Sequence, residues 1–416
     1  MSNSPKEKKM ATLVYDPDVY EEVDLDAEEA SRKAEDKGTK RRKIVRVLLW
    51  IFGSLLTLAL LAAGVCFFVV KRAIRDGGYS ESWVEKVNGT TLSDEPYGDK
   101  PWEVMDVYLP AQVEPEKSQC AILFIHGGAW IGGARFEQEA FAKRAAKAGY
   151  LVANMEYMLY NDDLKEEKNS YSIQKVLDEI DMALAKLKEI GEEHGFDVQR
   201  VGLSGHSAGG HLSMLYAYTY KTRENGNPPV EVAFVAPRVG PSEFSAKSWR
   251  AEKKPDTIAW FVSFMSGVKV TGEQLVHPDA ETQKAIDSIS PSHYIKPGVP
   301  PTLAAYGAKD SLVPAPQCQI TKRAFAKIYA HSFGEVPPGD KSTPVFDLIL
   351  FPNSNHMLAR DPDCTLKWQG LFLAYAERFL QLPEVVEPTP DAGLNDLRNL
   401  APGVDDGDDE EPEETL

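Results

Sequence analysis

The stretch RVGLSGHSAGGHL, residues 200–212, decides the fold of this chain. Its centre, GHSAG at residues 205–209, fits the pattern G-x-S-x-G. An apolar strand pattern runs into the motif and a helical pattern follows it, which is the context of a nucleophile elbow. The serine of such an elbow occupies a strained turn, so Gly205 and Gly209 supply the small neighbours that it requires. The stretch therefore predicts Ser207 as a nucleophile, with the backbone N–H of Ala208 placed to stabilise an oxyanion.

Strand and helix patterns alternate on both sides of this elbow, across a predicted domain at 83–383. Apolar strand patterns occur at 103–110, 120–128, 150–157, 200–205, 231–240, 301–310 and 346–355, and amphipathic helix patterns lie between most of them. This alternation predicts an α/β fold, in which a mostly parallel central sheet carries helices on both faces. A segment at about 242–290 interrupts the pattern and is interpreted as a small cap.

A second glycine-rich stretch, HGGAW at residues 126–130, follows the buried strand pattern at 120–125. Glycines let a backbone approach a substrate oxygen and turn N–H groups towards it. The stretch therefore predicts the other half of an oxyanion hole. For His126 we expect a structural role, in which hydrogen bonds hold the loop.

A serine hydroxyl needs a base that is oriented by a carboxylate. In this topology the acid and then the histidine follow the serine along the chain. Asp310 and His356 each come directly after a buried strand pattern, so both are predicted at the sheet edge that carries Ser207. His206 and His211 flank the elbow, where their side chains cannot easily reach back to the serine. The predicted constellation is thus Ser207, Asp310 and His356.

The quoted motifs resemble the α/β-hydrolase superfamily, and within it the hormone-sensitive-lipase-like and feruloyl-esterase-like branch of esterases and lipases. The resemblance spans about 97–380 and rests on YGDKPWEVMDVYLP, HGGAWIGG, GHSAGGHL, SPSHYI and YGAKDSLVP in family order. It implies the α/β-hydrolase fold and the same nucleophile, acid and base. It also implies a loop shaped by Gly127 and three oxyanion donors: Gly128, Ala129 and Ala208.

The cap segment contains TIAWFVSFMSG, which is rich in aromatic residues. One interpretation is a helix that packs on the core. The other is a wall of an apolar substrate pocket, formed with Trp130 by Trp260, Phe261 and Phe264. The two interpretations are compatible.

A separate apolar stretch at 44–70 predicts a single transmembrane anchor. Its part from Val47 to Val70 carries no charge and would reach about 36 Å as a helix, enough to span a bilayer. A cleaved signal peptide would have a shorter apolar region that starts nearer the N-terminus. The basic run KGTKRRK precedes the stretch and fewer basic residues follow it, so we expect the N-terminus to be cytoplasmic and the domain extracytoplasmic.

The remaining segments are interpreted as non-catalytic. Residues 1–43 form a polar cytoplasmic tail, 71–82 a linker, and 384–416 an acidic tail whose composition favours disorder. The net charge of −17 and the lack of a basic stripe argue against nucleic acid as a partner. No residue spacing suggests a metal site, and the predicted chemistry needs no cofactor. The sequence carries no pattern that fixes an oligomeric state, and a Cys318–Cys364 disulfide stays open beside free thiols.

Three functional hypotheses follow from these patterns. The first is a membrane-anchored carboxylesterase that acts on a small-molecule ester. The second is an amidase or peptidase of the same fold, because a triad does not choose between esters and amides. The third is a catalytically silent, membrane-tethered binding protein, which the presence of all three triad residues disfavours.

The predicted orientation is testable by protease protection. Protease added to intact cells should digest the C-terminal domain and leave the N-terminal tail intact, because only the former would lie outside the cytoplasmic membrane. Epitope tags at the two ends, followed on immunoblots, measure this. A digested N-terminal tag beside a protected C-terminal domain would reverse the predicted orientation.

Overall fold

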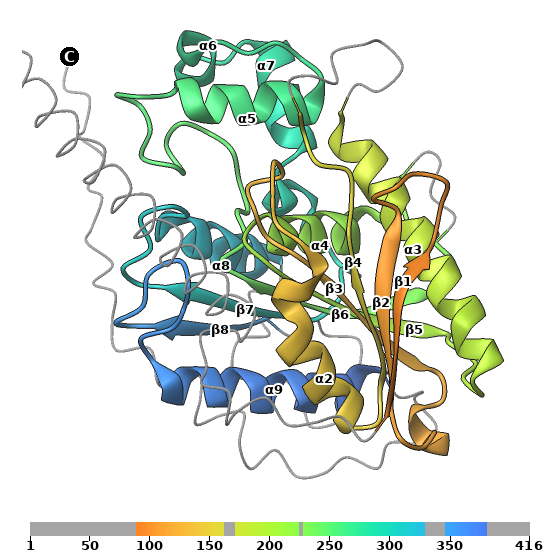
Figure 1. The fold of residues 1–416 in the computed structure, drawn as a ribbon. Coiled ribbons are helices and arrows are strands. Elements are labelled where there is room, and N and C mark those ends of the chain that lie inside the picture. The colour runs from red at the N-terminus through yellow and green to blue at the C-terminus, as the bar shows by residue number, and fades with distance from the viewer. Residues whose placement is uncertain (1–88, 162–170, 224–227, 329–345, 381–416) are drawn as a thin grey trace, which may run out of the picture. The chain divides into compact units, whose positions relative to one another are not determined.

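An eight-stranded sheet is the centre of the part of the chain that this computed structural model describes, which comprises residues 89–161, 171–223, 228–328 and 346–380 (Figure 1). The spatial order of its strands is β1-β2-β4-β3-β5-β6-β7-β8. Their bounds are β1 (Thr90–Pro96), β2 (Val104–Leu109), β3 (Cys120–Ile125), β4 (Leu151–Met155), β5 (Arg200–His206), β6 (Glu231–Arg238), β7 (Thr302–Gly307) and β8 (Phe346–Phe351).

The sheet is mostly parallel, as the alternating sequence pattern predicts. Strands β3 to β8 pair in parallel, whereas β2 is antiparallel to β4 and β1 is antiparallel to β2. The sequence patterns indicate every strand except β1. This edge strand has mostly exposed side chains and a register irregularity between Leu92 and Glu95, so it lacks the apolar alternation that would reveal it.

Strand β3 shows why the central strands are almost wholly apolar. All its side chains are buried, and they alternate between two core clusters. Leu123 and Ile125 belong to the cluster on one face of the sheet, while Ile122 and Phe124 belong to the cluster on the other. A strand covered on both faces has no solvent side, so it reads as a continuous apolar run.

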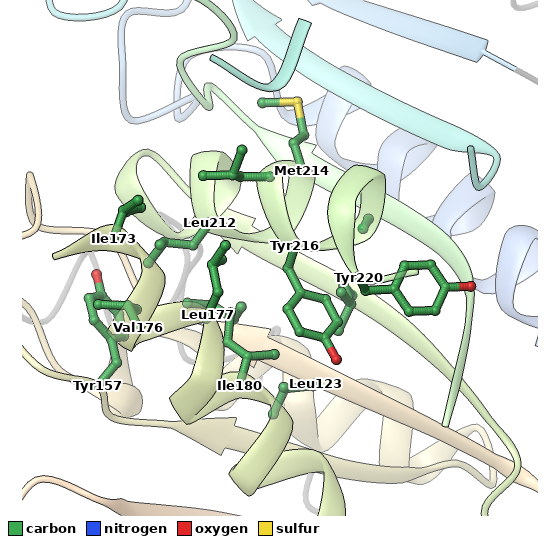
Figure 2. Packing of buried hydrophobic residues seen from close by; sticks show 14 of the residues in the cluster. Leu123, Tyr157, Ile173, Val176, Leu177, Ile180, Leu212, Met214, Tyr216 and Tyr220 are labelled. Carbon is green, nitrogen blue, oxygen red and sulfur yellow. The ribbon is translucent and has the colours of Figure 1, made fainter. Parts of the chain in front are cut away.

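Helices cover both faces of the sheet (Figure 1). One face carries α2 (Glu139–Lys147) and α9 (Pro362–Leu380), and the other carries α3 (Ile173–Glu193), α4 (Ala208–Thr219) and α8 (Pro316–Ile328). Figure 2 shows the second face, where Val176, Leu177 and Ile180 of α3 lie beside Leu212 and Tyr216 of α4. Helix α4 is buried along its whole length, which explains why it lacks a polar stripe.

Three short helices form the cap between β6 and β7. They are α5 (Asp256–Ser266), α6 (Gly272–Val276) and α7 (Ala280–Ser288), and a 3-10 turn, η5 (Pro291–Tyr294), leads from them back to the sheet. The cap lies at the top of Figure 1, beyond the main layers of the fold. It occupies the segment that breaks the strand–helix alternation in the sequence.

The predicted membrane anchor at 44–70 lies outside the described residues, as do the linker and both tails. Among the helices that are described, none has the length and apolarity needed to cross a bilayer. Cys120, Cys318 and Cys364 are free thiols, so Cys318 and Cys364 are not bridged.

The aromatic packing under α9 predicts a large effect on stability. Phe372 is buried against the rings of Phe124 and Phe234, with centroids 5.7 and 5.6 Å away. Phe372→Ala should lower the free energy of unfolding by about 3–5 kcal/mol, because it removes these contacts and leaves a cavity. Leu366 lies on the same helix and is 47% exposed, so Leu366→Ala should change the free energy of unfolding by at most about 0.5 kcal/mol. Denaturant unfolding measures both, and equal effects would contradict the packing argument.

Candidate active site

The turn at Ser207 joins β5 to α4 through a strained backbone. Ser207 has φ 56° and ψ −119°, far from the helical values that begin at the next residue. Its N–H donates to the carbonyl of Arg238 at the end of β6, over 2.9 Å. A Cβ atom on Gly205 would lie 2.3 Å from the backbone of Gly209, and one on Gly209 would lie 2.0 Å from the Ile125 carbonyl. Only glycine fits at these two positions, as the motif requires.

The structure brings Ser207, Asp310 and His356 together in one hydrogen-bonded row. His356 Nε2 lies 2.8 Å from Ser207 Oγ, and His356 Nδ1 lies 2.7 Å from Asp310 Oδ2. The carboxylate can only accept, so Nδ1 carries a proton and Nε2 is left to accept the serine proton. This is the geometry that a histidine needs to act as a general base towards the hydroxyl.

Asp310 is held by its own turn after β7. Its Oδ1 accepts the N–H groups of Leu312 and Val313 over 2.8 and 2.9 Å, and its side chain is fully buried. These bonds leave Oδ2 for His356. This buried carboxylate thus accepts from three donors, and it is placed both to orient the imidazole and to stabilise its cationic form.

A second carboxylate fixes the loop that carries His356. Asp361 accepts from the backbone N–H of Asn353 at 3.0 Å and from the hydroxyl of Ser354 at 2.6 Å. Burial raises the pKa of Asp361, but these hydrogen bonds outweigh it and hold the pKa below its ordinary value. The ionised Asp361 carboxylate thus closes the loop by hydrogen bonds to its start. The backbone around His356 is therefore held by these bonds as well as by the contacts of the His356 ring.

The glycine-rich loop after β3 lies against the elbow with three consecutive positive φ angles. They are 116° at Gly128, 53° at Ala129 and 62° at Trp130. For the two residues that are not glycine, such a backbone costs on the order of 1 kcal/mol each. The N–H groups of Ile131 and Gly132 both donate to the Gly128 carbonyl, which closes the loop.

The N–H groups of this loop have the freedom that oxyanion donors need. Among the described residues, no acceptor is bonded to the N–H of Gly128 or Ala129. The N–H of Ala208 belongs to the first turn of α4, where backbone donors have no partner inside the helix. Gly127 lies beside the nucleophile, since a Cβ atom built on it would be 3.4 Å from Ser207 Cβ. Of the four residues expected at the oxyanion hole, Gly127 and Ala208 thus lie next to Ser207, and the donor role of Gly128 and Ala129 stays a prediction.

His126 is engaged at both ring nitrogens, which agrees with the structural role expected for it. Nδ1 bonds the Gly127 carbonyl at 2.7 Å, and Nε2 lies 3.1 Å from Glu156 Oε2. Tyr157 stacks on the ring and donates its hydroxyl proton to the His126 carbonyl. Burial raises the pKa of Glu156, but His126 and Arg135 outweigh it, so the pKa lies below its ordinary value. These contacts fix His126, the residue at which the glycine-rich loop begins.

The two histidines beside the elbow are neutral and point away from the serine proton. Nε2 of His206 donates to the His356 carbonyl at 2.9 Å, and Nε2 of His211 donates to the Ile289 carbonyl at 2.7 Å. Burial lowers the pKa of His206 well below its ordinary value, and the nearby Arg238 guanidinium lowers it further. Burial also lowers the pKa of His211, to about 4. Neither ring is placed to act as a base.

The aromatic residues expected at a substrate pocket contact one another. The ring centroid of Trp130 lies 5.3 Å from that of Phe261 and 6.5 Å from that of Phe264. The centroids of Trp260 and Phe264 are 5.0 Å apart. Trp130 and Phe264 are buried, whereas Trp260 is 37% exposed. The cap helix therefore packs on the glycine-rich loop at residues 126–130, as the first interpretation expects. A role for these four rings as a pocket wall stays a prediction.

Several contacts of the site have no counterpart in the sequence patterns. They include the bonds of His206 to His356 and of Trp130 to His211, which join separate elements, and the bond of Asp361 to Ser354, which closes a loop. Within the described ranges, no three His, Cys, Asp or Glu side chains gather in a way that could hold a metal ion.

Known proteins resemble this chain both in sequence and in fold. The family model BD-FAE matches residues 105–325, more than half of the chain, and its match ends before His356. Esterase LipC of Mycobacterium tuberculosis is 26% identical over 224 residues, which are 54% of this chain and 52% of LipC. Kynurenine formamidase of Danio rerio is 26% identical over 148 residues, 35% of this chain and 45% of that protein. The chain thus spans about half the length of these curated relatives.

Solved structures share the fold over most of the chain. A truncated carbohydrate esterase from gut microbiota has a TM-score of 0.53 at 19% identity and covers 72% of this chain and 99% of its own. An inhibited esterase B of Lactobacillus rhamnosis has a TM-score of 0.53 at 21% identity, with coverage of 76% and 96%. Together with the family model and the LipC match, these structures bear out the resemblance to α/β-hydrolase esterases that the sequence motifs indicate.

The neutral, buried His211 predicts a loss of stability in acid. Its pKa is about 4 in the folded protein, against 6.5 in an ordinary environment. Between these values only the unfolded chain takes up a proton, so the free energy of unfolding falls as the pH drops, by about 3 kcal/mol for this group. His211→Gln should remove that part of the pH dependence, while Ser213→Ala on the same helix should keep it. Thermal melts from pH 7.5 to 4.5 measure the slopes; equal slopes for wild type and His211→Gln would contradict this account.

Proposed function

This chain belongs to the BD-FAE family, and on that premise we propose that it is a serine carboxylesterase. The observation that carries the proposal is the hydrogen-bonded row from Ser207 through His356 to Asp310. The names of the esterase relatives support the reaction class. In this proposal Ser207 is the nucleophile, His356 the general base and Asp310 the group that orients the base.

Acylation begins when Ser207 Oγ attacks the ester carbonyl carbon. His356 Nε2 takes the serine proton, and the imidazolium that forms is stabilised by Asp310. The carbonyl oxygen becomes an oxyanion, which accepts hydrogen bonds from the backbone N–H groups of Gly128, Ala129 and Ala208. The imidazolium then gives its proton to the leaving alcohol as the carbon–oxygen bond breaks, and the acyl group stays on Ser207.

Deacylation repeats the same chemistry with water. His356 removes a proton from a water molecule as that water attacks the acyl carbonyl, and the same donors stabilise the second oxyanion. The proton then passes from His356 to Ser207 Oγ when the acid leaves. The original serine proton leaves with the alcohol and a proton from water replaces it on Ser207, so the enzyme returns to its starting state and the residues named suffice without a cofactor.

Amide hydrolysis is the second candidate function. One curated relative is named a kynurenine formamidase, and the triad geometry does not by itself distinguish esters from amides. A panel that compares short acyl esters with matched aryl amides and formamides on the purified protein separates the two. A higher kcat/KM for the amides would replace the esterase proposal by this one.

We also propose that residues 44–70 anchor the enzyme in the cytoplasmic membrane with the catalytic domain outside. The support is the uncharged stretch from Val47 to Val70 and the basic run that precedes it. Substrate would then be a small-molecule ester that reaches the enzyme from outside the cytoplasm. Protease protection of tagged cells is the test of this part.

The catalytic proposal predicts that Ser207→Ala abolishes hydrolysis of short acyl esters and labelling by a fluorophosphonate probe. Asp310→Asn should lower kcat by about 10³- to 10⁴-fold, because the imidazole loses its orienting charge. Ser204→Ala is the matched control, since Ser204 precedes the motif on β5 and its buried hydroxyl donates to the Ala236 carbonyl. It should keep both activity and labelling. Full activity in Ser207→Ala would overturn the proposal.

A further inference from the structure

Trp130 is fixed by contacts on several sides. Its indole N–H donates to His211 Nδ1 over 3.2 Å, and its backbone carbonyl accepts the N–H of Tyr160 over 2.7 Å. The rings of Phe244 and Phe261 lie 5.8 and 5.3 Å from the indole. The ring contacts tolerate small rotations, whereas the N–H bond is directional. That bond therefore sets the orientation of Trp130 more narrowly than its packing does.

His211 joins Trp130 to two other parts of the fold. It belongs to the first turn of α4, where its own N–H donates to the Ser207 carbonyl over 3.0 Å. On its far side Nε2 donates to the carbonyl of Ile289, the residue that follows the last cap helix α7. The side chain is completely buried. One imidazole thus connects helix α4, the end of the cap, and the loop at residues 126–130 that carries the proposed oxyanion donors, called the oxyanion loop below.

The two hydrogen bonds of His211 leave it a single protonation state. A carbonyl only accepts, so Nε2 must carry the proton. Nδ1 is then the acceptor that the indole N–H of Trp130 requires. Because burial lowers the pKa of His211 to about 4, a second proton does not displace this arrangement near neutral pH.

The oxyanion loop needs such support, because Ala129 and Trp130 both hold left-handed φ angles. If Trp130 turned back towards an ordinary conformation, the N–H groups just before it would turn with it. Those N–H groups are the proposed oxyanion donors. Their direction matters most when negative charge develops on the carbonyl oxygen, and less when the uncharged substrate binds.

We infer that Trp130 and His211 form a positioning pair, in which the indole–imidazole hydrogen bond, braced by the Ile289 carbonyl, holds the oxyanion loop in its catalytic shape. Neither side chain touches the reacting atoms in this inference; both act through the N–H groups of Gly128 and Ala129. This inference rests on the proposed serine hydrolase function. It adds that stabilisation of the transition state depends on the cap.

The first test is Trp130→Phe in the full chain, assayed on p-nitrophenyl acetate. Phenylalanine keeps an aromatic ring in the cluster and removes the N–H donor. We expect kcat to fall about 10- to 100-fold, with KM within about 3-fold of wild type, because loss of a whole oxyanion donor costs about 10²- to 10³-fold. The rate of Ser207 phosphonylation should fall in parallel, since that reaction also places a negative oxygen in the hole.

Trp249→Phe is the matched control. Its indole N–H donates to the Glu243 carbonyl over 2.8 Å within the cap segment, and its ring packs 5.6 Å from Phe244 in the same aromatic cluster. It therefore loses the same chemical group from the same cluster without touching the oxyanion loop. We expect its kcat to remain within about 2-fold of wild type. An equal loss of kcat in this control would overturn the inference.

A double-mutant cycle with His211→Gln tests whether the two residues act as one unit. The loss of kcat in the double variant should not exceed the larger single loss. If His211→Gln does not fold, Trp130→Phe and its control decide alone. Additive losses, an unchanged kcat in Trp130→Phe, or an effect on KM with kcat retained would each overturn the inference. Activity that survives Ser207→Ala would instead overturn the proposed function, so the two failures are distinguishable.

Discussion

The backbone strain at Ser207 is the constraint on which the rest of the site depends. A non-glycine residue with φ 56° is held only where the surroundings leave it no alternative. Here Gly205 and Gly209 allow backbone atoms of neighbouring elements to close in on both sides, and the Arg238 carbonyl fixes the serine N–H. The strain turns Oγ out of the sheet edge and leaves the first N–H of α4 free. One conformational cost thus presents both the proposed nucleophile and a proposed oxyanion donor.

Sequence patterns predict the parts of this site that are local. A strand that is buried on both faces, a glycine that permits a close approach and a polar residue just after a strand are all visible within ten residues. Ser207, Asp310 and His356 were therefore recognisable, and parallel strands bring them to one edge of the sheet. The chain order of the family supplied the rest of that assignment.

The parts that could not be predicted depend on partners far away in the chain. Nothing in the sequence near His206 indicates that its ring bonds the carbonyl of His356, 150 residues later. Strand β1 was not predicted for a different reason, because an exposed edge strand needs no alternation of apolar residues. The histidines illustrate the general point: His206, His211 and His356 are the same residue type, and only their surroundings distinguish the proposed base, His356, from the two neutral rings that bond backbone carbonyls.

The bond from His211 to the cap ends on a main-chain carbonyl, that of Ile289. Every amino acid carries such a carbonyl, so this contact places no demand on the side chain at that position. The cap is therefore free to drift in sequence while it keeps supporting the catalytic loop, provided that its last turn stays in place. Of the three members of the arrangement, only Trp130 and His211 contribute side chains. In cap exchange between related enzymes, the backbone path at this junction is the part to preserve.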